Sequence, residues 1–172
     1  MDIINEAKLK DEVTSSLRHQ CAKRASTIAL MIEEAAREGI DSSHARRAIT
    51  RYGEALGEGI KAEMADPSDL VEFAEYFGVG LDRNIYEMET LASDEDRLYI
   101  DFHYCPYVAQ WMKMGKNPEE LDLLCDIAMD GDRGIGSRFP DFEFKLGKTI
   151  AQGNPVCQIR FDKVGRPTGT LS

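Results

Sequence analysis

The first half of the chain has apolar residues at helical spacing. In residues 6–38, apolar side chains recur every three or four positions among residues that favour helices. This pattern predicts a long amphipathic helix that Gly39 ends. Asp41-Ser42-Ser43 then offers a helix cap, and a second helix is expected to run to about Met64.

The predicted second helix contains three glycines, which would weaken it in isolation. Gly53, Gly57 and Gly59 each lower helix propensity, so we expect this helix to pack closely against a neighbour. Asp66-Pro67 is typical of a helix start and predicts a third helix, which Gly78 ends. Residues 1–80 are therefore expected to be mainly helical.

The second half changes to the alternation that is typical of strands. Residues 84–92 and 97–105 are rich in β-branched and aromatic side chains with a period of two. The side chains of the second strand are expected to alternate between its two faces. Leu98, Ile100, Phe102 and Tyr104 would lie on one face, and Tyr99, Asp101, His103 and Cys105 on the other.

Two short helices and a hairpin are expected to complete the fold. Pro106 begins a helix to about Gly115, and Asn117-Pro118 begins another to about Met129, where the glycine-rich residues 130–136 are expected to break it. Residues 142–151 and 156–163 alternate cleanly around the turn at 152–155, which predicts an antiparallel hairpin; the tail after Val164 is expected to fray.

These elements predict an α+β fold, with a helical N-terminal half followed by a mixed α/β half that holds an antiparallel sheet and a C-terminal hairpin. We interpret residues 1–172 as a single domain, in which residues 1–80 form a helical subregion and residues 81–164 form the α/β subregion that carries the site.

Composition narrows the class of protein. Hydrophobic residues make up 42% and charged residues 30% of the chain, no apolar run approaches 18 residues, and no export signal is evident, so we expect a cytoplasmic protein without a membrane partner. The formal net charge of −10 disfavours nucleic acid as a partner. The N-terminal helices offer a surface for a homo-oligomer.

His103 and Cys105 are the first candidates for chemistry. They are expected on the same strand face, and Pro106 would place Cys105 at a helix N-cap, where amide groups and the helix dipole stabilise a thiolate. The neighbouring imidazole could then exchange a proton with it. The alternative is a buried cysteine beside a hydrogen-bonded histidine.

The other cysteines suggest core positions. Cys125 falls on the apolar face of its predicted helix, and Cys157 falls on the core face of the last strand. Cys105, Cys125, Cys157 and His103 could instead converge as a zinc site, although their separations in the sequence match no compact zinc motif. Cys21 is assigned no function.

A third group of candidates follows the helix that carries Cys125. Asp130, Asp132 and Arg133 cluster where that helix is expected to end. Acidic groups at a helix C-terminus oppose its dipole, and Arg133 offers a planar fork to a substrate carboxylate. The alternative is a solvated loop with an Asp–Arg pair.

Three ordered blocks of sequence resemble a known family. "FHYCPYVAQW", "LCDIAMDGDRGI" and "FEFKLGKTIAQGNPVCQIRF" together resemble the L-2-amino-thiazoline-4-carboxylic acid hydrolase family, most strongly over residues 98–162. The resemblance implies hydrolysis of a small cyclic carbon–nitrogen substrate that bears a carboxylate, giving a carbamoyl-cysteine on the way to cysteine. Such an enzyme acts on carbon–nitrogen bonds other than peptide bonds.

That chemistry needs a proton donor, activation of water or an enzyme nucleophile, and a cation for the carboxylate. We interpret His103 as acid/base, Cys105 as nucleophile, and Asp130 or Asp132 as the group that orients water. Arg133, Tyr104 and Cys125 are expected to bind substrate, and no cofactor is expected unless zinc is bound.

The C-terminal pattern is also similar to the 4-vinyl-reductase-type small-molecule-binding domain. In the hairpin "TIAQGNPVC", Thr149 stands where the first hairpin cysteine of zinc-binding members would be, which argues against a metal. The alternative functions are therefore a non-catalytic sensor or carrier of a small molecule or metal, and an interaction module whose cysteines are only core residues.

Overall fold

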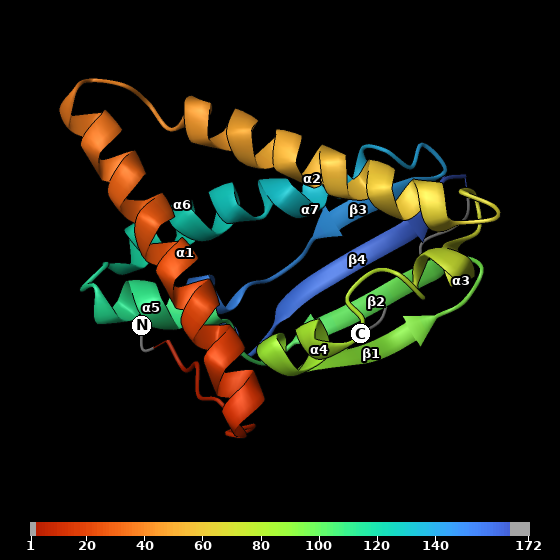
Figure 1. The fold of residues 1–172 in the computed structure, drawn as a ribbon, viewed down its shortest axis with the longest axis horizontal. Coiled ribbons are helices and arrows are strands. Elements are labelled where there is room, and N and C mark those ends of the chain that lie inside the picture. The colour runs from red at the N-terminus through yellow and green to blue at the C-terminus, as the bar shows by residue number, and fades with distance from the viewer. Residues whose placement is uncertain (1–2, 166–172) are drawn as a thin grey trace.

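A four-stranded antiparallel sheet and the helices around it make up the computed structural model, which describes residues 3–165. The sheet order is β1-β2-β4-β3, so β2 and β4 lie in the middle (Figure 1). The strands are β1 (Met88–Ser93), β2 (Arg97–Phe102), β3 (Phe142–Leu146) and β4 (Cys157–Lys163). This confirms the predicted α+β fold and the antiparallel pairing of the last two strands.

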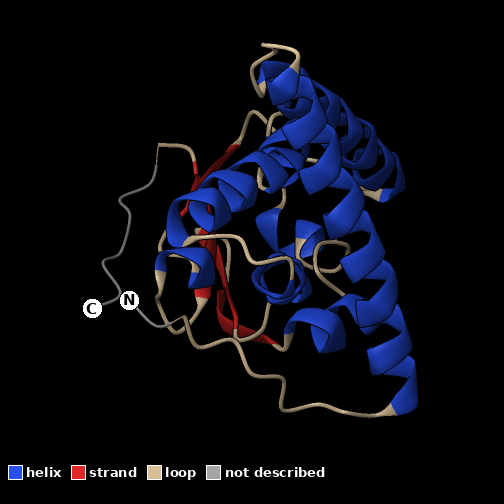
Figure 2. Ribbon diagram, turned by 90° about the vertical axis from the view of Figure 1, so that its left-hand side faces the viewer, coloured by secondary structure: helices blue, strands red, loops and turns tan. Residues whose placement is uncertain are grey.

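Most of the helices gather on one side of the sheet (Figure 2). They are α1 (Glu12–Arg37), α2 (Ser43–Glu63), α3 (Leu70–Phe73), α4 (Leu81–Tyr86), α5 (Pro106–Lys113), α6 (Pro118–Ala128) and α7 (Asp130–Gly136), with the 3-10 turn η1 (Ile150–Gln152) between β3 and β4. Within residues 3–165, no helix combines the length and the apolar character that a membrane span requires.

The core lies between the inner face of the sheet and the helices. On that face Leu98 pairs with Phe161, and Ile100 pairs with Ile159. Phe73 of α3 packs edge-on against Phe161, with ring centroids 5.0 Å apart. Because these side chains are fully buried, hydrophobic burial fixes the position of the helices against the sheet.

The first helix begins later than the sequence predicts. It starts at Glu12 rather than at residue 6, because the Asp11 carboxylate caps it by accepting from the Thr14 amide at 2.9 Å. The amides of Lys8 and Leu9 donate instead to the carboxylate of Glu87. The segment before α1 is therefore extended and fastened to a distant part of the chain.

The prediction of a strand over residues 84–92 is wrong in its first part, where the chain forms α4 before β1 begins. Glu87 ends α4 in the left-handed region, with φ of 50°. The buried guanidinium of Arg18 donates to the carbonyls of Asn84 and Ile85 and to the carboxylate of Glu87. These contacts with α1 satisfy backbone groups that a strand would have used.

Three other boundaries also differ from the sequence pattern. The third helix is only the short α3, which Asp69 caps, rather than a helix from Asp66-Pro67 to Gly78. β2 ends at Phe102 rather than at Cys105. β3 ends at Leu146, and the 3-10 turn η1 forms between β3 and Gly153. The connection between β3 and β4 is thus longer than a turn at residues 152–155.

Residues 130–136 form a helix, α7, where the sequence predicts a break. Figure 1 shows α7 running alongside α2. A Cβ atom at Gly53 of α2 would overlap the backbone of Gly131, and one at Gly134 of α7 would overlap the carbonyl of Thr50. The close backbone contact overrides the poor helix propensity of these glycines. It confirms the expected packing role of Gly53 and Gly57, whereas Gly59 faces open space.

Two identical substitutions in α2 should therefore have opposite effects on stability. Gly53→Ala should lower the free energy of unfolding by about 1–3 kcal/mol, because the new methyl group meets backbone that must shift. Gly59→Ala should raise it by about 0.5–1 kcal/mol, because alanine favours the helix and nothing lies within 4 Å. Chemical denaturation of both variants measures the difference, and equal effects would contradict the close contact.

Candidate active site

The structure does not keep His103 and Cys105 on one strand face, because β2 ends at Phe102. The Nε2 atom of His103 lies 2.8 Å from Oε2 of Glu89 on β1. The backbone of Cys105 is held by Asn5, whose side-chain amide donates to the Cys105 carbonyl and accepts from its N–H. His103 and Cys105 are therefore directed by different partners.

Cys105 is the N-cap of α5, with Pro106 in the first turn, as the sequence predicts. Burial raises the pKa of its thiol to about 11, although the amides of Val108 and Tyr107 lower it. The desolvation of the thiolate thus outweighs the helix amides. At neutral pH Cys105 is a thiol, which does not favour a nucleophilic role.

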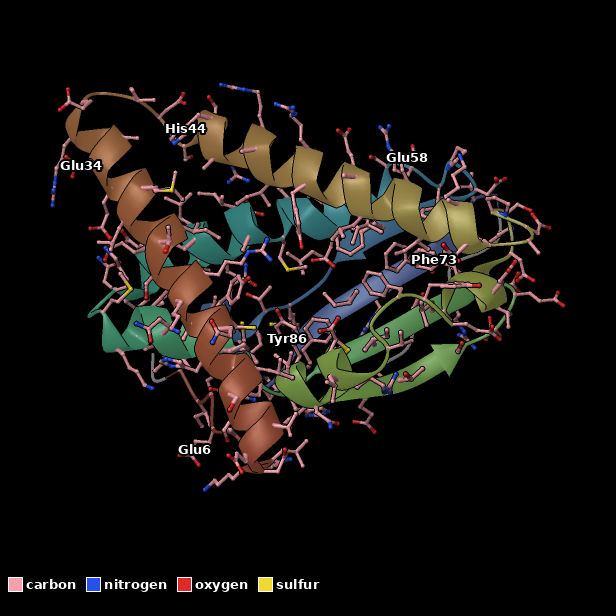
Figure 3. The ribbon with its side chains drawn as sticks, viewed as in Figure 1. Glu6, Glu34, His44, Glu58, Phe73 and Tyr86 are labelled. Carbon is pink, nitrogen blue, oxygen red and sulfur yellow. The ribbon has the colours of Figure 1, made fainter. Side chains whose placement is uncertain are left out.

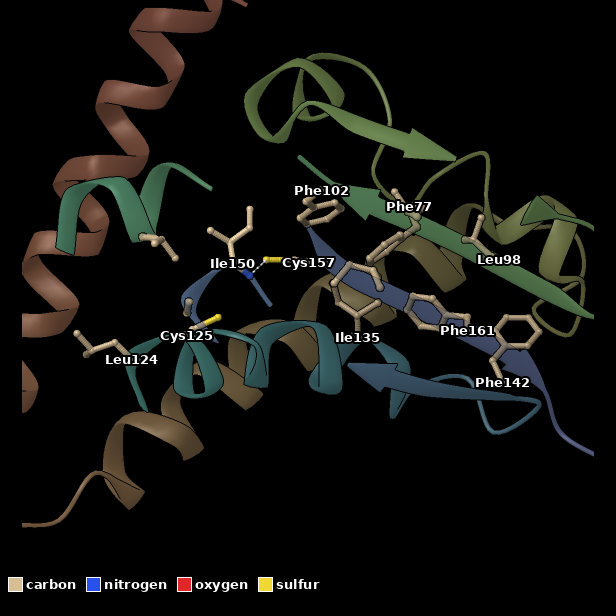
Figure 4. Packing of buried hydrophobic residues seen from close by; sticks show 14 of the residues in the cluster. Phe77, Leu98, Phe102, Leu124, Cys125, Ile135, Phe142, Ile150, Cys157 and Phe161 are labelled. Atoms are coloured by element: carbon tan, nitrogen blue, oxygen red, sulfur yellow. Dashed lines mark hydrogen bonds between the residues drawn. The ribbon is translucent and has the colours of Figure 1, made fainter. Parts of the chain in front are cut away.

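Cys125 and Cys157 are buried, in agreement with the expected core positions (Figure 4). The Sγ atom of Cys157 accepts a hydrogen bond from the Ile150 amide, and burial raises its pKa to about 12. Thiols in this state are poor metal ligands. Within residues 3–165, no group of three or more His, Cys, Asp or Glu side chains could hold a metal ion, so His103, Cys105, Cys125 and Cys157 do not form a ligand set here.

Arg133 and Asp130 belong to a closed ion-pair network. Arg133 donates to Asp126 and Asp130 at 2.5 and 2.6 Å, and Arg46 of α2 donates to the same two carboxylates at 2.7 and 3.0 Å. Burial would raise the pKa of Asp126, but the hydrogen bonds from Arg46 and Arg133 hold it below its usual value. These four side chains join α2 to α6 and α7. The guanidinium of Arg133 is already paired with two carboxylates of the protein.

Asp132 differs from its two acidic neighbours, because it takes no part in this network. Within residues 3–165 its carboxyl group forms no ion pair and no hydrogen bond with another side chain. Burial raises its pKa from 3.8 to about 6, although the charges of Arg133 and Arg24 lower it. A carboxyl group that titrates near neutral pH is suited to proton transfer.

Polar groups of other helices have an electrostatic influence on Asp132 or on one another. We define the Asp132 cluster as Asp132 of α7, the two groups coupled to it (Arg24 of α1 and Tyr86 of α4), and the groups coupled in turn to Tyr86: Cys21 of α1, Cys105, and Tyr107 of α5. Figure 3 shows Tyr86 near the middle of the molecule, between α1 and the sheet. Burial raises the pKa of both Tyr86 and Tyr107, so each hydroxyl is a hydrogen-bond donor at neutral pH.

Sequence reasoning missed Cys21, Arg24, Tyr86 and Tyr107. They stand in segments that predict ordinary helix or strand, and no motif or spacing links them to Asp132. The predicted substrate-binding residue Tyr104 is placed differently, because its ring lies under the guanidinium of Arg18, with Cζ 4.3 Å from the centroid. Cys125 lies in the core outside the Asp132 cluster.

A surface pocket of about 350 Å³ lies beside α6 and η1. Its lining residues are Glu119, Asp122, Leu123, Cys125, Asp126, Leu146, Thr149 and Gln152. Three of them are carboxylates, of which Asp126 is already paired with Arg46 and Arg133, and none is a cation, so the pocket offers no free positive group to an anionic ligand. The Asp132 cluster, which holds both signs of charge, is the better candidate site for a substrate that bears a carboxylate.

The chain thus combines an α+β fold with a partly buried carboxyl group that has no side-chain partner among residues 3–165. The family model described as L-2-amino-thiazoline-4-carboxylic acid hydrolase matches residues 18–161, and the chain belongs to this family. The match extends the resemblance into the helical half, including Arg24 on α1. A search of curated proteins finds no match.

Replacing Asp130 and Asp132 by asparagine should change the stability of the protein in opposite directions. Asp130→Asn should destabilise the protein by about 1–3 kcal/mol, because Arg46 and Arg133 each lose a charged partner. Asp132→Asn should stabilise it at pH 7.5 by up to about 3 kcal/mol, because the pKa of Asp132 rises from 3.8 to about 6 on folding.

The pH dependence gives the control. Between pH 4 and 6 the folded protein holds a proton on Asp132 that the unfolded chain has lost, so wild-type stability falls as the pH rises through this window. The advantage of Asp132→Asn should therefore shrink towards pH 4. Thermal denaturation at several pH values measures it, and an advantage that does not vary with pH would argue against a raised pKa.

Proposed function

We propose that this protein hydrolyses a small cyclic amidine that bears a carboxylate, with 2-amino-thiazoline-4-carboxylate as the first substrate to test. The family match supports the reaction class. The observation that carries the proposal is the carboxyl group of Asp132, which is unpaired among the described side chains and has a pKa of about 6.

Asp132 acts as the general base. A cyclic amidine takes up a proton readily, and the cation that results is attracted to the Asp132 carboxylate, which is ionised above its pKa of about 6. The carboxylate accepts a proton from a water molecule as this water attacks the carbon of the C=N bond. A base with a pKa close to the working pH serves this step because it can also return the proton.

The reaction balances with water as the only co-reactant. The water oxygen bonds to the amidine carbon, and the electron pair of the C=N bond moves to the ring nitrogen. The C–S bond then breaks as the C=O bond forms, since a thiol is the most acidic leaving group available. The sulfur takes the proton from Asp132, the proton of the new hydroxyl goes to solvent, and the product is a carbamoyl-cysteine.

The other groups of the cluster bind and orient. Tyr86 and Tyr107 remain protonated because burial raises their pKa, so they can donate hydrogen bonds to the oxygen or nitrogen atoms of the reacting carbon. Cys105 contributes shape and a low-polarity surface rather than a nucleophile, since its pKa is raised to about 11. His103 pairs with Glu89 and has no part in the proposed step.

The test is release of a free thiol from 2-amino-thiazoline-4-carboxylate. Wild-type kcat/KM should rise with pH and level off above about pH 6, because only the ionised Asp132 accepts a proton. Asp132→Asn should lower kcat at least about 100-fold. Asp122→Asn, an exposed substitution on α6, is the matched control and should leave kcat unchanged.

Cys105→Ala separates the two mechanisms that the sequence suggests. Turnover should persist in this variant, measured at a temperature where its melting curve shows a folded protein. Loss of turnover in Cys105→Ala together with activity in Asp132→Asn would move the chemistry to the thiol. No turnover by folded wild-type protein would reject the hydrolase in favour of a non-catalytic binding protein.

A further inference from the structure

One side of α2 is apolar and exposed along most of its length. Ala48, Tyr52, Ala55, Leu56 and Gly59 recur every three or four positions, so they share this side of the helix, away from the glycines that contact α7. All five are exposed, Tyr52 by 47% and Leu56 by 42%. Figure 1 shows α2 along the upper edge of the molecule, with α7 beside it. A contiguous exposed apolar patch of this kind is typical of a surface that binds a partner.

A row of exposed charged residues borders this apolar side. Arg47 and Arg51 belong to the first half of α2 and Glu58 to the second, and their spacing of four and seven positions places them on one side of the helix. Arg51 forms no ion pair and no hydrogen bond through its side chain within residues 3–165. The Glu58 carboxylate lies 3.6 Å from the Arg138 guanidinium, which is a loose ion pair. The row is therefore positive towards the start of α2 and negative towards its end.

The order of these charges favours a second copy of α2 in antiparallel orientation. In an antiparallel pair of helices centred on Ala55, residues equally far before and after it face each other. Arg51 stands four positions before Ala55 and Glu58 three positions after it, so Arg51 of each copy comes to lie beside Glu58 of the other. A parallel pair would instead place Arg51 against Arg51. The face is therefore complementary to itself in one orientation only.

The apolar residues fit the same arrangement. Ala48, Ala55 and Gly59 carry at most a methyl group, so two such helices can approach closely along this row. Tyr52 then packs against Leu56 of the second copy, on the side of the helix opposite to the charged row. The ring of Tyr52 is held in place by Arg24 of α1, whose Cζ atom lies 4.6 Å from the ring centroid.

We propose that this protein forms a twofold symmetric homodimer through the exposed side of α2, with Arg51–Glu58 ion pairs on both sides of Ala55. The dimer covers the side of α2 that α7 leaves open, so it adds to the contact at Gly53 and Gly57 without replacing it. Because one pair of helices makes a small interface, the dissociation constant is expected to be on the order of 1–10 μM. The inference uses no residue of the Asp132 cluster except the support of Tyr52 by Arg24, and it does not depend on the proposed function.

The experiment is sedimentation equilibrium of the full chain at concentrations from about 1 to 100 μM, a range that brackets the expected dissociation constant. Wild-type protein should approach the mass of two chains at the highest concentration. Arg51→Glu and Glu58→Arg should each raise the dissociation constant about 10-fold or more, because each places like charges together twice across the twofold axis. Lys113→Glu, an exposed substitution on α5, makes the same change in net charge as Arg51→Glu and should leave the dissociation constant unchanged.

Mixing the two weakened variants distinguishes a broken ion pair from a damaged fold. In a heterodimer of Arg51→Glu with Glu58→Arg, every position that pairs across the axis again holds one positive and one negative residue. An equimolar mixture should therefore dimerise with a dissociation constant close to that of wild type, although each variant alone is mainly monomeric. The double variant Arg51→Glu/Glu58→Arg, which exchanges the two charges within one chain, should likewise dimerise by itself.

Three results would overturn the proposal. The first is a wild-type mass of one chain at every concentration, which would leave the exposed side of α2 to a different partner. The second is a dimer that Arg51→Glu and Lys113→Glu weaken equally, which would attribute the effect to net charge. The third is a mixture of Arg51→Glu and Glu58→Arg that stays monomeric, which would place the contact between copies elsewhere on the molecule.

Discussion

The contact between the backbones of α2 and α7 is the constraint on which the candidate site depends. Only glycine allows the approach at Gly53 and Gly134, because a methyl group at either position would meet backbone atoms. The same interface carries the pairing of Arg46 with Asp126 and Asp130, two of the three aspartates between residues 126 and 132. Asp132, in the same first turn of α7, has no such partner among the described residues, and burial raises its pKa.

Where hydrophobic periodicity and local caps decide the structure, the sequence predicts the fold well. It finds α1, α2, α5, α6 and the β3–β4 pairing, whose signals are contained within each segment. It misplaces α4 and α7, because distant contacts decide both. Arg18 of α1 binds the carbonyls that end α4, and α2 supports a glycine-rich helix that would be unstable alone.

The same distinction applies to the site. Asp132 and Cys105 are found from the sequence because they stand in short, unusual stretches, but their pKa values depend on burial, which no local pattern reveals. Asp130 and Asp132 look equivalent in "MDGDRG" and differ only through the partners that α2 supplies.

The strand order has a consequence for the synthesis of the protein. β4 lies in the middle of the sheet between β2 and β3, yet it is the last strand of the described chain to be made. Until it leaves the ribosome, β2 has an unpaired edge, whereas α7 is made earlier and can already meet the glycine face of α2. The sheet therefore cannot close until residue 163 has emerged, and until then β2 offers an open edge to which another chain could pair.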